Sequence, residues 1–295
     1  MNIPVLLTIS LAVALGGSVI SKYYTNKTSS GFVPLFLYNA IASFVGAIVF
    51  LCWGGFGDFS PFTLLLGALF GFIVSVQTVA TMLALRVGPM SFTTVIVSFS
   101  TVLTALSGAL FWDEKLKTLQ IVGIVLMALS FVFAVERGQN EKRASWQWLI
   151  FCLIAFACSG GVGLMQKIHQ TSVHKNELNA FLIMAFIVST VLSVVFACVA
   201  KRKEKTPLLP CDKKGKTQWW LTGLIAVGGG CVAVNHKLNL FLSGKMDSAV
   251  FFPIVNGGGL VLATIAALII FREKLTKKQW CGVVIGTISV LCLCL

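Results

Sequence analysis

The sequence predicts an all-α integral membrane protein with ten transmembrane helices, arranged as two inverted five-helix repeats. The composition is 57% hydrophobic and only 11% charged, whereas soluble domains carry about 25% charged residues. Apolar runs of about 20 residues, enough for a helix to cross a bilayer, recur along the whole chain. A polar turn motif also occurs in both halves. A soluble core could not bury this much apolar surface, whereas lipid can.

The boundaries of the spans follow from tryptophan and proline. Indole prefers the membrane interface, and all seven tryptophans fall at the ends of expected spans. Pro61 and Pro89 come just before spans, where a missing N–H costs least, and Pro253 lies inside one. The first span lacks the basic flank of a cleavable signal peptide. The expected spans are residues 3–21, 33–53, 62–85, 90–112, 116–135, 146–166, 178–200, 219–241, 246–271 and 278–295.

Charge predicts an orientation and argues against nucleic acid as a partner. The net charge is +13, but the basic residues are scattered among short loops and do not gather on one domain. Most of the 23 Lys and Arg residues follow spans 1, 3, 5, 7 and 9, including the long loop at residues 201–216. Positive loops stay in the cytoplasm. The bias therefore predicts a cell-membrane protein with both termini outside.

An internal repeat divides the chain at residues 1–138 and 139–295. The turn Glu114-Lys115-Leu116 is echoed by Glu273-Lys274-Leu275. The match continues in register, pairing Gln120 with Gln279, Gly123 with Gly282, and Ser130 with Ser289. Each half contains five expected spans, and an odd number gives the two halves opposite orientations, as in many secondary transporters. Such folds place the substrate near the midplane between the halves.

On these motifs the chain resembles the ten-helix EamA-type branch of the drug/metabolite transporter superfamily. The two E-K-L turns carry the resemblance, with Ala84-Leu85 before Gly88 and with Pro253 in span 9. The first half has Val97 and Ser98 where span 9 has its proline. The resemblance implies export of amino acids, metabolites or drugs. It also implies cytoplasmic termini, which is opposite to the charge bias. No cofactor is expected.

Polar side chains inside spans usually face a cavity or another helix, because lipid-facing polar groups are costly. Span 8 is the richest, with Asn235, His236 and Asn239 near one helical face. The pattern suits either a substrate site or an interfacial helix end, and His236 can act as a pH-sensitive gate or simply form a hydrogen bond. Lys237 is expected to point elsewhere or to snorkel to the interface.

Other spans add candidates. Span 4 has a stripe of hydroxyls that includes Ser98, which fits a pore lining or close helix packing equally well. Pro253, Asn256 and residues 257–259 mark a place where span 9 can bend or unwind. Tyr38 in span 2 is a further plausible lining residue. The predicted substrate-binding residues are Asn39, Gln77, Thr81, Ser98, Asn235, His236, Asn239 and Asn256.

Charged residues refine the expected mechanism. All ten acids map to loops or span ends, which disfavours proton antiport through a carboxylate buried at mid-membrane. Lys22 and Lys167, at equivalent ends of spans 1 and 6, are expected to snorkel, with help in holding an anionic group as the alternative. The nine cysteines follow no metal or disulfide pattern, so no metal is expected.

The leading hypothesis is a secondary-active carrier that exports a small polar, amino-acid-like metabolite by alternating access. An uptake carrier for a sugar or similar neutral solute is the alternative. A lipid- or prenyl-modifying enzyme is the rival, but it needs paired acids or a His–acid couple, and the nearest acid to His169 and His174 is Glu177. Partners are a small-molecule substrate, a coupling ion or proton, and the bilayer. The chain is expected to be a monomer or homodimer.

Overall fold

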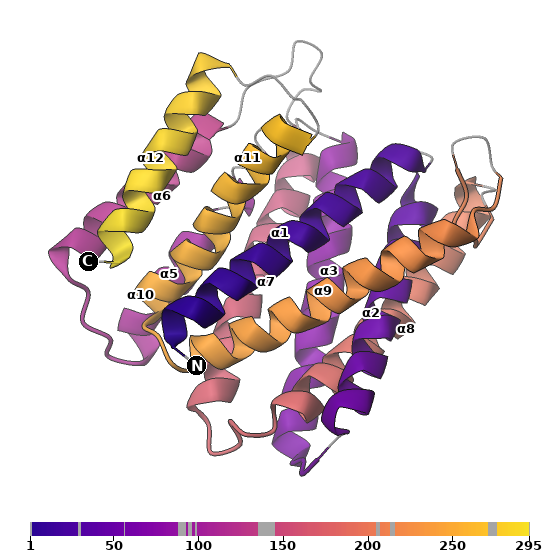
Figure 1. Cartoon of the computed structure of the whole chain (residues 1–295), viewed down its shortest axis with the longest axis horizontal. Helices are drawn as coiled ribbons and strands as arrows, with labels where there is room; N and C mark the ends of the chain where they lie inside the picture. Colours follow the sequence, from indigo (N-terminus) through magenta and orange to yellow (C-terminus); the bar gives the residue numbers. More distant parts are fainter. Residues whose placement is uncertain are drawn as a thin grey trace. The chain divides into compact units, whose positions relative to one another are not determined.

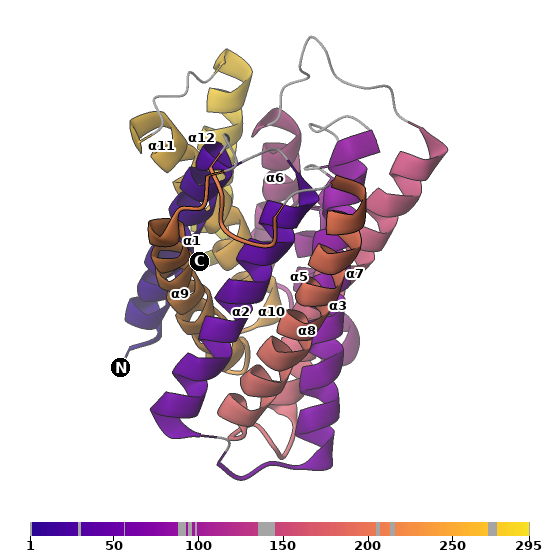
Figure 2. The same ribbon diagram turned by 90° about the vertical axis from the view of Figure 1, so that its right-hand side faces the viewer.

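The computed structural model describes residues 2–28, 31–55, 57–87, 93, 96–97, 99–134, 145–204, 207–212, 216–270 and 276–294. Within these ranges the chain is helical, with one isolated antiparallel bridge between Cys211 and Thr217 (Figure 1 and Figure 2). The helices are α1 (Ile3–Lys27), α2 (Phe32–Gly54), α3 (Pro61–Val87), α5 (Ser100–Phe111), α6 (Thr118–Ala134), α7 (Trp146–Thr171), α8 (Leu178–Glu204), α9 (Trp219–Ser243), α10 (Ser248–Pro253), the π-helix η1 (Ile254–Gly258), α11 (Gly259–Ile270) and α12 (Lys277–Cys294).

The helical membrane class is confirmed, whereas the number of spans stays a prediction. In the described part of the chain, six helices are long and apolar enough to cross a membrane: α1, α2, α3, α7, α8 and α9. Shorter apolar helices cover Ser100–Phe111, Thr118–Ser130, Ser248–Gly258 and Trp280–Leu293. These shorter helices fall where spans 4, 5, 9 and 10 are expected.

The chain forms two compact units, and each draws helices from both halves of the sequence. Unit 1 comprises Met1–Ser75 and His169–Phe241, and unit 2 comprises Val76–Ile168 and Leu242–Leu295. Unit 1 therefore holds α1, α2, α8 and α9, and unit 2 holds α5, α6 and α10 to α12. The two units do not correspond to the two sequence repeats. The boundary between the repeats, between residues 138 and 139, stays a prediction.

The main pair of unit 1 is α2 with α8. The hydroxyls of Ser43 and Ser189 are 3.2 Å apart, and the rings of Phe36 and Phe196 have centroids 5.6 Å apart. Along α2 the residue numbers of these contacts rise from 36 to 43, whereas along α8 the numbers of their partners fall from 196 to 189. The two helices, which are the second helix of each expected repeat, run antiparallel.

The pairing of α6 with α12 in unit 2 shows the repeat directly. The Ser130 hydroxyl donates to the Gly282 carbonyl at 2.9 Å, and the Ser289 hydroxyl donates to the Gly123 carbonyl at 2.6 Å. The sequence repeat equates Ser130 with Ser289 and Gly123 with Gly282. The two bonds are therefore exchanged by a local two-fold axis, as in a symmetric interface. An antiparallel pair of equivalent helices is what an inverted repeat requires.

Glycines allow the helices of unit 1 to approach each other closely. A Cβ on Gly229 of α9 would lie 2.7 Å from the Ala42 carbonyl oxygen of α2. A Cβ on Gly67 of α3 would lie 2.6 Å from the Phe181 carbonyl oxygen of α8. Because backbone atoms stand at both places, the helices could not keep these positions with a larger residue, which is the packing expected of membrane helices.

The first E-K-L turn is a helix C-cap. At the end of α5, the N–H groups of Trp112 and Glu114 both donate to the Gly108 carbonyl, at 3.0 and 3.2 Å. Asp113 between them has φ +52°, the left-handed conformation that ends many helices. This reversal brings Glu114 back over Gly108. The second E-K-L turn, at residues 273–275, lies outside the described residues.

The ninth expected span departs from α geometry where the sequence predicts a bend. α10 ends at Pro253, the next five residues form η1, and α11 follows. Proline has no N–H to continue the ladder, and π-turns of this kind are frequent at functional sites. Gly257 of the π-turn faces Met127 of α6, because a Cβ at Gly257 would meet that side chain.

We predict that Gly229→Ala destabilises the protein by about 1–3 kcal/mol, because the new methyl group collides with the α2 backbone. The neighbouring Gly230 is the matched control, since a Cβ there meets nothing within 4 Å, and Gly230→Ala should keep or raise the stability by up to about 1 kcal/mol, because Ala is the better helix former. Thermal unfolding in detergent measures both. Equal stability of the two variants would contradict the close α2–α9 packing.

Candidate functional site

Unit 1 contains a cavity of about 510 Å³ between α1, α2 and α9. Sites for small molecules typically have volumes of about 300–1,000 Å³, so the cavity is large enough for a metabolite. It is lined by Val13, Ala14, Gly17, Ser18, Ser21, Tyr38, Cys231, Val232, Asn235 and His236.

Small residues on α1 and α9 create this space. The α1 residues that line the cavity follow each other at helical spacing and are mostly Ala, Gly or Ser. Gly17 lies beside α9, where a Cβ would be in ordinary contact with Cβ of Cys231 at 3.6 Å. A Cβ on Gly228 of α9 would lie 2.6 Å from the hydroxyl oxygen of Tyr38. Gly228 therefore leaves room for the Tyr38 hydroxyl at the cavity wall.

Two polar atoms of the lining are buried and lack a hydrogen bond of standard geometry to any described residue: the Tyr38 hydroxyl and Nδ1 of His236. The Ser21 side chain is near enough to the Tyr38 hydroxyl to interact with it. The His236 ring packs edge-on against Phe70 and Phe186, with centroids 5.9 and 5.8 Å away. An unsatisfied buried polar group costs about 1–3 kcal/mol. A solute that offers partners to these atoms recovers this free energy on binding.

Asn235 and Asn239 belong to a closed hydrogen-bond ring with Ser10 of α1. The Ser10 hydroxyl donates to Oδ1 of Asn239 at 2.6 Å, and Nδ2 of Asn239 donates to Oδ1 of Asn235 at 3.1 Å. Nδ2 of Asn235 returns to Ser10, 3.1 Å from its hydroxyl and 3.0 Å from its carbonyl oxygen. The ring joins α1 to α9. Asn235 also lines the cavity, as does the predicted His236.

The other predicted site residues lie elsewhere, and their roles stay predictions. Asn39 is half-buried on α2, next to Tyr38. Gln77 and Thr81 are half-buried on the part of α3 that belongs to unit 2. Asn256 is exposed in the π-turn of unit 2. Ser98 lies outside the described residues.

The sequence reasoning missed the contribution of α1. Ser10, Ser18 and Ser21 were not among the predicted site residues, yet the first bonds the asparagines and the other two line the cavity. The signal was present, because small and polar residues recur every three or four positions at Ser10, Ala14, Gly17 and Ser21. This pattern marks one face of an otherwise apolar span.

Lys237 follows the expectation that it points elsewhere. Its ammonium group lies 5.4 Å from the ring centroid of Phe50 and 4.8 Å from that of Trp53. These are cation–π distances. Trp53 itself is exposed at the end of α2. The Lys237 ammonium therefore lies beside the aromatic end of α2.

Lys167 corrects the snorkelling expectation. Its ammonium group lies 2.7 Å from Oε1 of Glu114 and donates to the Met246 carbonyl at 2.9 Å, and both charged side chains are largely buried. Oε2 of Glu114 accepts the N–H of Ser248 at 2.7 Å and so caps the N-terminus of α10. In unit 2 the first E-K-L turn thus joins α5 to α7 and α10. The Lys22 side chain lies outside the described residues.

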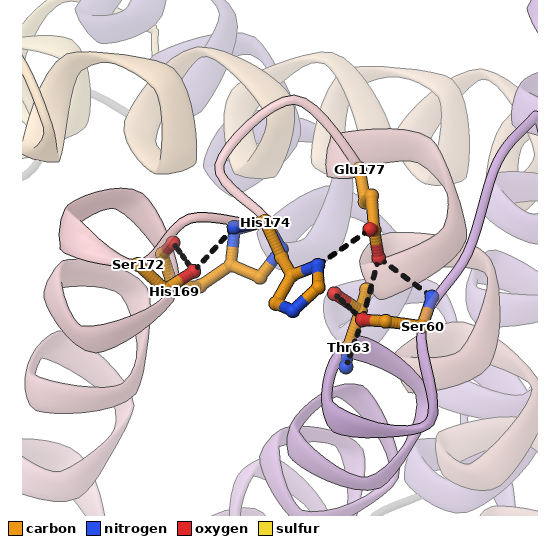
Figure 3. Close-up of polar contacts among 6 residues, drawn as sticks. All are labelled: Ser60, Thr63, His169, Ser172, His174 and Glu177. Carbon is orange, nitrogen blue, oxygen red and sulfur yellow. Dashed lines mark hydrogen bonds and ion pairs between the residues drawn. The ribbon is translucent and has the colours of Figure 1, made fainter.

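Glu177 organises a second polar cluster in unit 1, between the α7–α8 loop and the start of α3 (Figure 3). One carboxylate oxygen lies 2.8 Å from Nδ1 of His174, and the other accepts the backbone N–H and the hydroxyl of Ser60 at 2.8 and 2.9 Å. Partial desolvation raises the pKa of Glu177. Interactions with Thr63, Ser60 and His174 outweigh this effect and lower the pKa to about 2.

The His174–Glu177 contact is a His–acid couple of the kind that the enzyme hypothesis requires, so its geometry matters. The Ser60 hydroxyl donates to Glu177 and not to His174, whereas a nucleophilic serine donates to the histidine. Ser60 also accepts the N–H of Thr63 at 3.2 Å, the usual N-cap bond of a helix. The cluster therefore fixes the start of α3. No group of three His, Cys, Asp or Glu residues suited to a metal ion occurs in the described ranges.

The fold is that of a multi-pass helical membrane protein, and unit 1 contains a cavity of metabolite size. The sequence matches the EamA-like transporter family over residues 2–135 and 146–295. The chain therefore belongs to this family of the drug/metabolite transporter superfamily, as the E-K-L turns indicated. No curated protein matches it. A crystal structure of a protein 12% identical to it has a TM-score of 0.73 and is matched over 98% of this chain and 94% of the other, which supports the fold.

Because the folded-state pKa of Glu177 lies below its ordinary value of 4.5, the ionised carboxylate stabilises the protein above about pH 4.5, and this stabilisation is lost as the pH falls toward 2. Glu177→Gln should therefore lower the stability at pH 7 by about 1–3 kcal/mol, the cost of unsatisfied donors. Thermal unfolding of wild type and variant across this pH range measures the difference.

The difference between Glu177→Gln and wild type should shrink as the pH approaches 2. Asp58 is an exposed acid in the loop before α3, and Asp58→Asn serves as the control with no comparable effect. A difference that stays constant from pH 7 to pH 2 would show that the carboxylate charge does not stabilise the start of α3.

Proposed function

We propose that the chain is a secondary-active carrier that binds a small polar solute in the α1–α2–α9 cavity and moves it by alternating access. The observation that carries this proposal is the pair of buried polar atoms at the cavity wall, the Tyr38 hydroxyl and Nδ1 of His236, in a space of about 510 Å³. The family supplies the class of activity. The cavity supplies a place where a solute can form hydrogen bonds with these two buried atoms.

We further propose export of an amino-acid-like metabolite across the cell membrane, with both termini outside. The resemblance supports export, and the distribution of Lys and Arg supports the orientation. The competing hypothesis is uptake of a neutral solute such as a sugar. Proteoliposomes of known protein orientation with an imposed proton or sodium gradient separate the two: solute that accumulates against the direction of ion flow indicates export, and solute that accumulates with it indicates uptake.

Tyr38→Phe tests the site. We expect the affinity for the transported solute, identified by a thermal-shift screen of amino acids, sugars and nucleosides, to fall about five- to tenfold, since one hydrogen bond of about 1 kcal/mol is lost. The same screen and flux in proteoliposomes measure the change.

Tyr23→Phe is the matched control, because Tyr23 is exposed on α1 and is not among the cavity-lining residues. It should keep wild-type affinity. Equal affinity of Tyr38→Phe, Tyr23→Phe and wild type would remove the Tyr38 hydroxyl from the proposed site.

A further inference from the structure

Helix α1 is the least buried wall of the cavity. Only 11% of its apolar stretch is buried, compared with 44% for α2 and 28% for α9. Its contacts with α9 at the cavity are made by small residues, with a Cβ on Gly16 or Gly17 falling 3.8 and 3.6 Å from atoms of Cys231. α2, in contrast, packs along α8 through aromatic rings and the Ser43–Ser189 contact. Moving α1 therefore disturbs less packing than moving α2.

The closed ring of Ser10, Asn235 and Asn239 connects α1 to α9 through side-chain hydrogen bonds. Each member both donates to and accepts from another member. Hydrogen bonds in such a chain reinforce one another in a low-dielectric surrounding. Removing either asparagine leaves the other two members with an unsatisfied group, whereas removing the Ser10 hydroxyl leaves Asn235 bonded to the Ser10 carbonyl oxygen.

Asn235 has two roles that compete. Its amide nitrogen is directed to Ser10, and its oxygen accepts from Asn239, yet the same residue lines the cavity beside His236. The Asn235 amide nitrogen directs its donors to the carbonyl oxygen and the hydroxyl of Ser10. A solute that accepts a hydrogen bond from this nitrogen must therefore displace at least one bond of the ring. Solute binding and ring closure therefore oppose each other: the solute binds less tightly when the ring is closed, and bound solute makes ring closure less favourable.

We propose that the Ser10–Asn235–Asn239 ring controls the movement of α1, which we call the release of α1. The closed ring holds α1 against α9, and a solute that bonds the amide nitrogen of Asn235 opens the ring and lets α1 move away. This inference rests on the proposed solute site, since it assigns the solute a contact with Asn235. Cys231 is half-buried, lines the cavity and has Gly16 and Gly17 as its neighbours on α1, so movement of α1 increases its exposure. Cys231 is therefore a native probe of α1 movement that needs no knowledge of the solute.

The test is the rate of alkylation of Cys231 by N-ethylmaleimide in the full-length protein, followed by peptide mass spectrometry. Ser10→Ala removes the hydroxyl from the ring but keeps the bond from Asn235 to the Ser10 carbonyl oxygen. It should accelerate labelling of Cys231 about five- to tenfold, the change expected from losing about one net hydrogen bond. Asn239→Ala removes a member of the ring and should act in the same direction. Ser10→Thr keeps a hydroxyl and should stay closer to wild type.

Thr8→Ala is the matched control, because the Thr8 hydroxyl bonds only the Pro4 carbonyl of its own helix among the described contacts. It should leave the Cys231 rate unchanged. Cys152 is fully buried in unit 2 and serves as a reporter of general unfolding. The proposal expects its labelling to stay slow in every variant.

Two results would overturn the release. One is an unchanged Cys231 rate in both Ser10→Ala and Asn239→Ala. The other is equal acceleration at Cys231 and Cys152, which would mean that the ring holds the whole fold and not α1. The labelling experiment contains no solute, so it tests the ring independently of the solute site. Faster labelling of Cys231 alone supports the ring as the holder of α1, even if Tyr38→Phe leaves transport unchanged.

Discussion

The antiparallel pairing of equivalent helices is the constraint on which the rest of the fold depends. Lipid supplies no hydrophobic drive between helices, so small residues and hydroxyl bonds must hold them together. In unit 1 the Ser43–Ser189 contact lies within such a pair, and in unit 2 Ser130 and Ser289 exchange bonds with Gly282 and Gly123. The odd number of helices expected in each repeat makes this antiparallel arrangement unavoidable.

Carboxylates provide the second common device, and they do so at helix ends. Glu204 accepts the N–H groups of Phe32 and Val33 at the start of α2, at 3.0 and 3.3 Å. Glu177 holds the start of α3, and Glu114 holds the start of α10. A helix N-terminus has free N–H groups and a partial positive charge. The acids are thus absent from the middle of the expected spans, and three of them stabilise helix N-termini at the span ends.

The sequence predicted the elements that depend on composition and local pattern. Apolar length gave the helices, the E-K-L repeat identified Gly123 with Gly282 and Ser130 with Ser289 as equivalent positions, and Pro253 marked the departure from α geometry in span 9. The contacts of Ser130 with Gly282 and of Ser289 with Gly123 came from the structure. The sequence could not predict partners that meet only after folding. Lys167 was expected to snorkel, because nothing local shows that Glu114 reaches it. Asn235 and Asn239 were found, but their partner Ser10 lies at the far end of the sequence.

Our central claim is that a transported solute binds in the cavity between α1, α2 and α9. Cryo-electron microscopy of the protein saturated with its solute tests it most directly. The account predicts solute density in this cavity, within hydrogen-bond distance of the Tyr38 hydroxyl and Nδ1 of His236. Solute density elsewhere, with the cavity holding only water or lipid, would contradict it.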